Sequence, residues 1–344
     1  MWVPVGCGAY PHLVVDWSFP SDDHDPFERI AQLPPPTGSD PRKQHVITRA
    51  LLKGFAEPGT AGKGWTLTPY DVVNRRLLKP RGVRGCGFVL DFIMYAAQSA
   101  ESTWKSVEDD LPTAIEAARA GDLHLAENSR LRDTITDAIA LHYVRTPRVR
   151  QQHSELTEKV TSAVRARTLA ERPADLEREF LRRTGLVPAG PEALDAVLDD
   201  VMRPWRESVA SGALARVSLV SLFERISAGL RGLPIEVWHT APKSELLISD
   251  NAAFTFAFSA DGTSAETNMA FGDSQGAALP IARDCLVAIG STPKDEVLPA
   301  HTASLLNEIQ VRNAGTYVYF RPGSGLARFV ESAAQTRATK GPAS

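Results

Sequence analysis

Two carboxylates and an arginine lie on otherwise apolar faces of predicted helices in the middle of the chain. Glu101, Trp104 and Glu108 are three and four residues apart, so they share one helical face. His142 and Arg145 share the apolar face of a second predicted helix. Because a guanidinium cannot be neutralised, a buried Arg145 needs carboxylate or carbonyl partners, and Glu101 and Glu108 are the candidates.

A third carboxylate, Asp250, ends the apolar stretch LLISDN at residues 246–251. Ser, Asp and Asn favour turns, so one interpretation is a tight Asx turn between two strands. The other is that Asp250 projects into a cleft at a strand end, where sites often form in α/β sheets. Composition alone does not decide between them.

The dipeptide Thr146-Pro147 directly follows Arg145. Proline removes a helical N–H group and disfavours the helical conformation of the residue before it. The helix over residues 130–152 should therefore kink or end at this point, which would free backbone carbonyls beside Arg145.

The bulk composition indicates an ordinary soluble globular protein. The 344 residues are 43% hydrophobic and 23% charged, and the net charge of −3 gives no overall basic field for nucleic acid. The three cysteines are far apart and have no metal-binding spacing, which is typical of reduced thiols. We find no signal peptide and no apolar run long enough to span a membrane, so we expect a cytoplasmic protein.

The order of the predicted elements indicates an α+β fold. We expect an N-terminal arm at residues 1–43, a single domain at 44–332 and a flexible tail at 333–344. Within the domain, a helical middle region at 85–230 should pack against a mixed or antiparallel β-sheet at 233–322. We expect the helical pattern to be interrupted near Pro112, and the arginines and acids between 145 and 183 to form a solvated, salt-bridged helix.

The familiar enzyme motifs are missing from the sequence. GTAGKGW at residue 59 has the wrong spacing for a phosphate-binding P-loop, and neither HExxH nor GxSxG occurs. These observations remove common enzyme classes but not every enzyme.

Five segments taken in order resemble an uncharacterised bacterial family, domain of unknown function 4238. The segments are QHVITRALLKGFA, AESTWKSVE, ALHYVRTPRVR, LLISDNAAF and LLNEIQVRNAGTYVYF. The resemblance covers residues 44–320 and implies a shared architecture but no reaction.

The family pattern matches this chain at a defined set of residues: His45, Glu101, Glu108, Arg145, Arg148, Ser249, Asp250, Asn251 and Asn307. The chain departs from the pattern where Gln44 replaces the usual first His, Thr48 a Pro, and Ala252 a Pro. The lost His puts any His-pair metal site in question.

Two hypotheses follow. In the first, the chain is a non-catalytic sensor or defence-associated module in which these residues form a buried Glu–Arg–Asp network, and an operon-encoded protein is a possible partner. In the second, it is a metal-dependent phosphodiesterase or nuclease that acts on nucleic acid or nucleotides.

The enzyme hypothesis assigns a role to each candidate residue. Glu101, Glu108 and Asp250 would hold Mg²⁺ or Mn²⁺. His45 or His142 would act as general acid or base, and Arg145 and Arg148 would clamp phosphate. Ser249, Asn251 and Asn307 would complete the substrate site.

Overall fold

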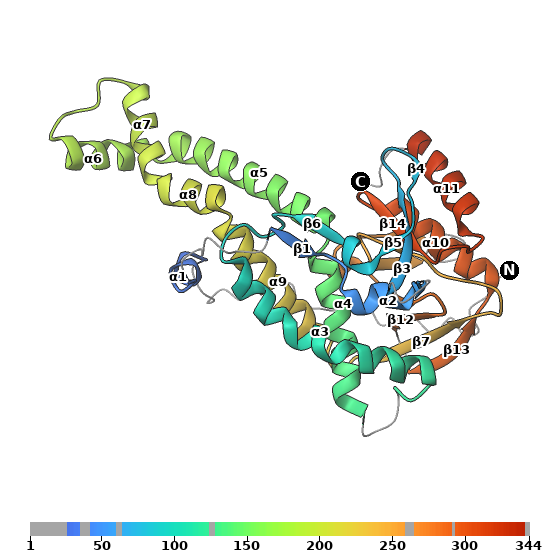
Figure 1. The fold of residues 1–344 in the computed structure, drawn as a ribbon. Helices are drawn as coiled ribbons and strands as arrows, with labels where there is room; N and C mark the ends of the chain where they lie inside the picture. The colour runs from blue at the N-terminus through green and yellow to red at the C-terminus, as the bar shows by residue number, and fades with distance from the viewer. Residues whose placement is uncertain are drawn as a thin grey trace.

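Along the chain, a helical middle region separates an N-terminal from a C-terminal group of strands. The helical middle and the C-terminal strands agree with the prediction from the sequence. The computed structural model describes residues 26–34, 42–59, 64–123, 128–258, 265–290 and 293–340. Within this part of the chain the strands precede residue 91 or follow residue 234, and helices fill the middle (Figure 1). The α+β prediction is therefore confirmed.

The larger sheet is mixed and comes from the C-terminal third of the chain. Its order is β10-β9-β11-β12-β7-β13, in which β13 runs parallel to β7 and the other pairs are antiparallel. Strands β11 and β12 are buried along their whole length, so this sheet is covered on both faces at its centre. Its strands are β7 (Ile235–Thr240), β9 (Phe254–Phe258), β10 (Ala265–Thr267), β11 (Gly276–Ala282), β12 (Cys285–Ile289) and β13 (Lys294–Leu298).

A second sheet combines strands from both ends of the domain. Strand β14 lies between β3 and β8, antiparallel to both, although some 250 residues separate β14 from β3 in sequence. The predicted C-terminal sheet thus gains N-terminal strands. The strands are β2 (Glu57–Pro58), β3 (Trp65–Asp71), β4 (Arg76–Leu77), β5 (Arg81–Gly82), β8 (Ile248–Ser249) and β14 (Tyr317–Phe320), and a separate pair is β1 (Lys43–His45) with β6 (Phe88–Leu90).

The helices largely follow the predicted pattern, with one difference at Pro112. The sequence predicts an interruption there, but α3 runs through the proline as one helix. Leu111, Ala114 and Ile115 are buried on both sides of it, so packing offsets the lost hydrogen bond. The helices are α1 (Pro26–Ala31), α2 (Arg49–Gly54), α3 (Ala97–Ala120), α4 (Ser129–Val144), α5 (Pro147–Glu171), α6 (Pro173–Thr184), α7 (Pro191–Val201), α8 (Arg203–Ser211), α9 (Ala213–Leu230), α10 (Ala300–Asn313) and α11 (Leu326–Lys340).

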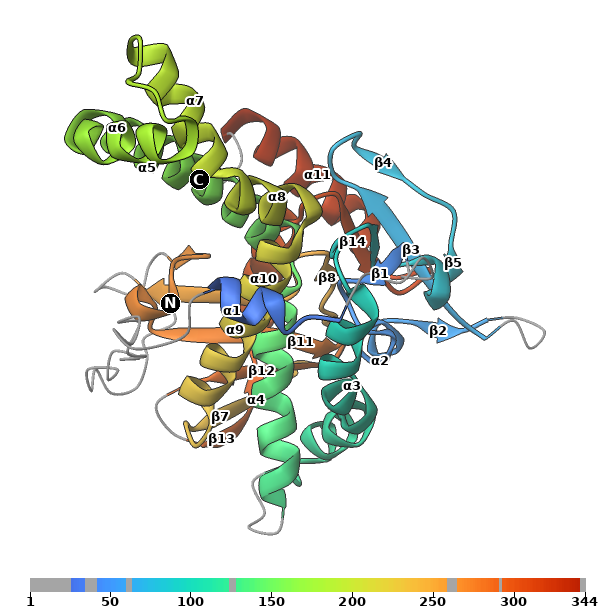
Figure 2. The same ribbon diagram turned by 90° about the vertical axis from the view of Figure 1, so that its left-hand side faces the viewer.

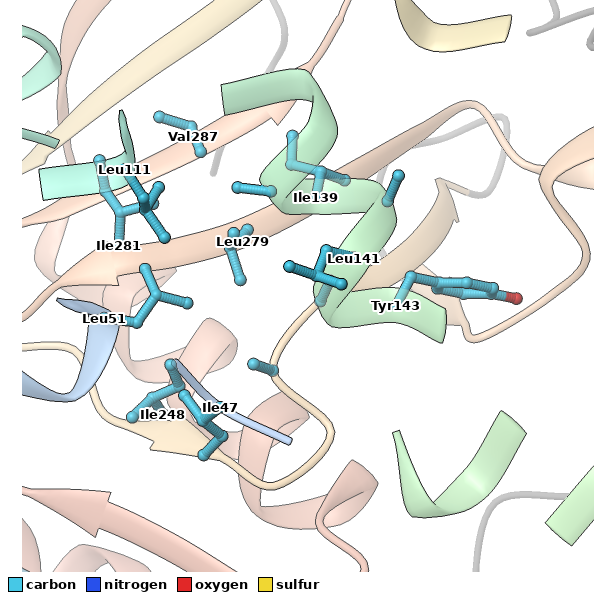
Figure 3. Close-up of a cluster of buried hydrophobic side chains, with 14 of the residues drawn as sticks. Ile47, Leu51, Leu111, Ile139, Leu141, Tyr143, Ile248, Leu279, Ile281 and Val287 are labelled. Carbon is cyan, nitrogen blue, oxygen red and sulfur yellow. The ribbon is translucent and has the colours of Figure 1, made fainter. Parts of the chain in front are cut away.

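Helix α4 forms the centre of the core. Every residue from Ala138 to Val144 is buried, and the helix packs against α3, α9 and strand β11. Figure 3 shows Ile139 and Leu141 of α4 facing Leu279 of β11, with Leu51 of α2 nearby. One apolar cluster joins residues from 46 to 319.

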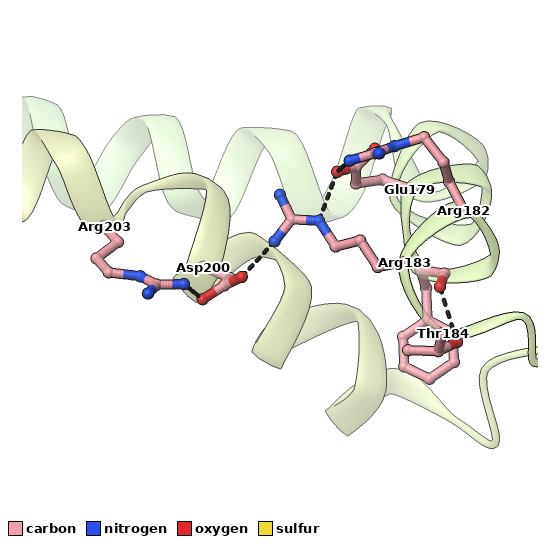
Figure 4. A network of polar contacts seen from close by, with 7 residues as sticks. Glu179, Arg182, Arg183, Thr184, Asp200 and Arg203 are labelled. Atoms are coloured by element: carbon pink, nitrogen blue, oxygen red, sulfur yellow. Dashed lines mark hydrogen bonds and ion pairs between the residues drawn. The ribbon is translucent and has the colours of Figure 1, made fainter.

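Helices α5 to α8 project from this body as an arm (Figures 1 and 2). Val149 at the base is the one residue of α5 buried within its described length, and a small separate cluster of Leu176, Val197 and Leu198 holds the far end together. Ion pairs form along the surface of the arm, as the sequence predicts. Glu179, for example, pairs with Arg182 at 2.6 Å. Figure 4 shows the same network continuing through Arg183 and Asp200 to Arg203.

The two ends of the chain differ from expectation where they are described. Part of the predicted N-terminal arm forms α1, which packs on α9, while residues 1–25 and 35–41 lie outside the described part. The predicted tail is part of α11, which runs to Lys340. Ala334 and Val330 of this helix are buried in an apolar cluster with Leu247 and Val318.

Candidate functional site

The predicted site residues gather around the joint between α4 and α5, where the arm leaves the body. Helix α4 ends at Val144 with Arg145 as its C-cap, and α5 begins at Pro147. The break predicted at Thr146-Pro147 is confirmed. The Thr146 hydroxyl donates to the Tyr143 carbonyl at 2.8 Å and accepts from the Val149 N–H at 3.2 Å, so one side chain satisfies both helix ends.

On one side of the joint lies the arginine cluster, which we define as Arg145, Glu101, Trp104, Glu108 and His45. The Arg145 side chain is 1% exposed. Its Nη1 donates to Glu108 Oε1 at 2.6 Å, and its Nη2 donates to Glu101 Oε1 at 3.1 Å. The guanidinium lies 4.8 Å from the centroid of the Trp104 ring. The helical stripe on α3 therefore supplies both carboxylate partners that Arg145 was expected to need.

The arginine cluster is incompletely satisfied. Arg145 Nε, Trp104 Nε1 and His45 Nε2 are buried without a hydrogen-bond partner within the described structure. The two carboxylates, in contrast, are about one-third exposed, at 30% for Glu101 and 34% for Glu108. The two carboxylates of α3 are thus in contact with solvent, whereas the unpaired polar atoms of Arg145, Trp104 and His45 are buried.

Burial and neighbouring charges set the protonation of this cluster. Burial raises the pKa of Glu101, and the charge of Arg145 lowers it in part. Burial lowers the pKa of His45, and Arg49 and Arg145 lower it further, while Glu108 raises it. His45 is thus favoured in its neutral form.

His142 performs a structural task. Its Nδ1 lies 2.8 Å from the Ala138 carbonyl and its Nε2 accepts from the Thr48 N–H at 3.2 Å, so both ring nitrogens are used. Complete burial lowers its pKa to about 3. The neutral ring therefore ties α4 to the start of α2, and its nitrogens have no free lone pair for proton transfer.

On the other side of the joint lies the strand-end cluster: Ser249, Asp250, Asn251, Asn307 and Gln310. Asp250 accepts from the N–H groups of Gly315, Thr316 and Tyr317 at 2.6, 2.7 and 3.0 Å. Burial raises the pKa of Asp250, and these three N–H groups lower it in part. Asp250 therefore fixes the turn before β14.

Gly315 also leaves room for the Asp250 carboxylate. A Cβ on Gly315 would lie 3.3 Å from Asp250 Oδ2 and 3.5 Å from the Pro147 side chain. The strand-end cluster consequently reaches the first residue of the arm.

Amide side chains hold the remaining backbone of LLISDNAA. Asn307 accepts from the Leu247 N–H at 2.9 Å and donates to the Glu245 carbonyl at 2.8 Å. Gln310 accepts from the N–H and hydroxyl of Ser249 and donates to the Ala252 carbonyl at 2.9 Å. The strand-like run breaks because β8 leaves the sheet of β14 here and the chain enters the other sheet at β9.

Asn251 connects this cluster to the arm. Its amide donates to the Asn313 carbonyl at 2.5 Å, and its Oδ1 accepts from the Arg148 N–H at 3.4 Å. The Arg148 guanidinium donates to the Asn268 carbonyl, and burial lowers its pKa. Both contacts of Arg148 are to backbone or amide groups of the protein itself.

The predicted metal ligands lie in two different clusters. Glu101 and Glu108 bind Arg145, whereas both oxygens of Asp250 bind backbone N–H groups. In the part of the chain that the structure describes, no group of three His, Cys, Asp or Glu side chains is placed to hold a metal ion. The geometry thus lends the Glu101–Glu108–Asp250 metal site no support.

Sequence reasoning missed Gln310. It also missed Thr48, whose N–H donates to His142. A signal for Gln310 was present, because Asn307, Gln310 and Asn313 repeat every three residues along one predicted helix. In the structure, Asn307 and Gln310 of this helix bind the backbone of Leu247 and Ser249 at β8.

Comparison with known proteins identifies one family. A family model described as "Protein of unknown function (DUF4238)" matches residues 43–324. The curated proteins contain no match, and neither do the solved structures. No helix of the described ranges has the length and apolar character needed to cross a membrane.

Proposed function

The chain belongs to the DUF4238 family, and from that premise we propose that it is a non-catalytic binding module whose two polar clusters fix the direction of the arm. A partner macromolecule would bind the arm, and a protein encoded beside this chain is the first candidate to test. The residues of the family pattern then serve to hold the α4–α5 joint.

One observation carries this proposal: the reactive atoms of Asp250, His142 and Arg145 are occupied by the protein itself. Asp250 accepts three backbone N–H groups, His142 uses both nitrogens, and Arg145 binds two carboxylates. A phosphodiesterase would instead need carboxylates that converge on an open position for metal and water.

The position of these contacts supports the same proposal. Arg145, Thr146 and Arg148 lie within four consecutive residues, and each is held by a hydrogen bond to another part of the body or within a helix cap. A helix that projects into solvent gains little from its own packing, so its direction depends on the joint at its base.

A distance measurement tests the rigidity of the joint. Spin labels at Thr113→Cys on α3 and Glu177→Cys on α6, with Cys7 replaced, should give one narrow distance distribution in the full chain. Arg145→Met should broaden it because α5 loses its tie to α3.

Arg130→Met is the matched control. Arg130 also links α4 to α3, through Asp110 at 2.7 Å, but its side chain is 80% exposed. This variant should leave the distribution unchanged. If Arg145→Met proves unstable, the double variant Glu101→Gln with Glu108→Gln weakens the same tie and takes its place. An equally narrow distribution in all variants would contradict the role of the joint.

A second measurement tests the absence of catalysis. Mn²⁺ and Mg²⁺ should leave the melting temperature unchanged, and the chain should not hydrolyse oligonucleotides or nucleotides. Metal-dependent hydrolysis that Glu108→Gln and Asp250→Asn both abolish would overturn the proposal in favour of the phosphodiesterase.

A further inference from the structure

The second attachment of the arm contains a buried cation that forms no ion pair with an acid in the described ranges of the chain. The arm returns to the body at Gly212, between α8 and α9, and a Cβ on this glycine would lie 3.4 Å from the Met94 side chain. The first turn of α9 therefore lies against the segment that leads into α3, and Figure 1 shows α9 beside α3.

Arg216 of α9 is the cation. It is 6% exposed, and among the described residues its one hydrogen bond runs from Nη2 to Ser99 Oγ at 3.3 Å. Its Nε is buried without a partner. Glu224 is the acid whose charge acts on Arg216, but Glu224 is 52% exposed and lies 3.6 Å from Arg29.

A buried guanidinium in this state is unfavourable for the empty protein. Burial lowers the pKa of Arg216, because removal from water disfavours its charged form. Arginine remains charged in proteins, so the penalty is relieved by an anion and not by loss of the proton.

The hydrogen bond of Arg216 is directed at the N-terminus of α3. This helix has 24 residues, and its N-cap, Ala96, has no side chain that can accept from the first turn. The first turn contains no acid. Ala97 is in the first turn, where a backbone N–H group has no acceptor within the helix. The helix dipole adds partial positive charge at the same place.

The start of α5 shows what a completed N-terminus looks like in this protein. Thr146 accepts from the Val149 N–H, and Asn251 accepts from the Arg148 N–H. The nearby Arg148 guanidinium is occupied by the Asn268 carbonyl. Positive charge at α5 is therefore matched by acceptors of the protein, whereas at α3 it is not.

We propose that Arg216 and the Ala97 amide bind an oxyanion of the phosphate class at the start of α3. The Ser99 hydroxyl donates to the Ala96 carbonyl at 2.8 Å and accepts from Arg216, so it positions the guanidinium. Guanidinium and amide are donors on two elements, and a tetrahedral anion presents several acceptor oxygens at once. The site is independent of the proposed function, since binding can be measured whatever the arm does.

The first experiment uses the full chain in an anion-poor buffer at constant ionic strength, with inorganic phosphate as the probe. Calorimetry should give one site, and titration should raise the melting temperature. Arg216→Met should abolish detectable binding. Ser99→Ala should weaken it by about tenfold or more, the loss expected for one hydrogen bond to a charged group.

Arg150→Met is the matched control, because it removes a partly buried arginine near the start of a capped helix. It should retain phosphate binding. Absence of binding to the wild-type chain, or equal binding by the Arg216→Met variant, would overturn the proposal. Pyrophosphate and adenosine monophosphate in the same assay distinguish a free inorganic anion from the phosphate of a nucleotide.

The stability of Arg216→Met without phosphate gives an independent readout. Removal of an unpaired buried charge should leave the melting temperature unchanged or raise it. A lower melting temperature in the absence of phosphate would mean that Arg216 is a structural residue and would contradict an anion site.

Discussion

The arginine cluster and the strand-end cluster hold the same joint with different chemistry. The arginine cluster sets one buried cation between two carboxylates that are about one-third exposed. The strand-end cluster uses amide side chains and one carboxylate, and these bind mainly backbone groups. The first cluster also leaves three buried polar atoms without a described partner, whereas Asp250, Gln310 and Asn307 are fully occupied.

This difference predicts how each cluster responds to change. Backbone N–H groups cannot move to water when their acceptor is removed, so loss of an acceptor in the strand-end cluster is costly. The carboxylates of the arginine cluster already contact water and can be solvated further. We therefore expect the largest stability effects on the strand-end side.

Asp250→Ala should give the largest effect. It would leave the N–H groups of Gly315, Thr316 and Tyr317 unpaired, and ~1–3 kcal/mol for each buried unpaired group gives an upper range of about 3–9 kcal/mol. Because these three residues are half-buried, the free energy of unfolding should fall by the lower part of that range, about 3–6 kcal/mol. Urea unfolding followed by circular dichroism measures this. The exposed Asp273→Ala is the control, and equal effects of the two variants would remove the contrast between the clusters.

Arg145→Met should come second. Breaking a buried ion pair costs roughly 3–5 kcal/mol, but the one-third exposure of both carboxylates should reduce the loss to about 2–3 kcal/mol. Arg130→Met, on the surface of the same two helices, should change stability by less than about 0.5 kcal/mol. An Arg145→Met effect greater than that of Asp250→Ala would reverse the ranking of the two clusters.

The pH dependence of stability should identify His142. Its pKa of about 3 in the fold lies below its unfolded value, so between these values the unfolded chain binds the extra proton. Stability should therefore fall as pH decreases, and His142 should account for about 2 kcal/mol between pH 7 and pH 5.

His142→Gln should flatten this part of the profile. His45 and His153 also have lowered pKa values and contribute with the same sign, so their Gln variants are the comparison. If His142→Gln and wild type have parallel profiles between pH 5 and 7, the buried neutral imidazole is not the source.

Glu108→Gln should give a smaller effect than these, about 1 kcal/mol, because its partner Arg145 is buried but the carboxylate itself is partly solvated. Glu101→Gln should cost less still, since its contact is longer, 3.1 against 2.6 Å, and burial already disfavours its charge. A double-mutant cycle with Arg145→Met isolates each pair. A larger coupling for Glu101 than for Glu108 would contradict this order.

Local patterns in the sequence were sufficient for much of this architecture. Three- and four-residue spacing placed Glu101, Trp104 and Glu108 on one face of a helix, and it placed Arg145 on the apolar face of another. Pro147 determined where α4 ends, because its ring and its missing N–H act within one turn. Pro112 has the same local chemistry, yet α3 continues through it because neighbouring residues are buried.

The sequence by itself therefore determined the elements, the break at the joint and the need of Arg145 for acids. Only the tertiary structure decided the role of Asp250, whose partners are 65 to 67 residues away in a turn that β14 brings beside β8. It likewise decided that Arg216 meets the start of α3, 117 residues earlier. The physical reason is that helical and strand periods act over a few residues, whereas a partner for a buried polar group is supplied by whichever distant segment packs against it.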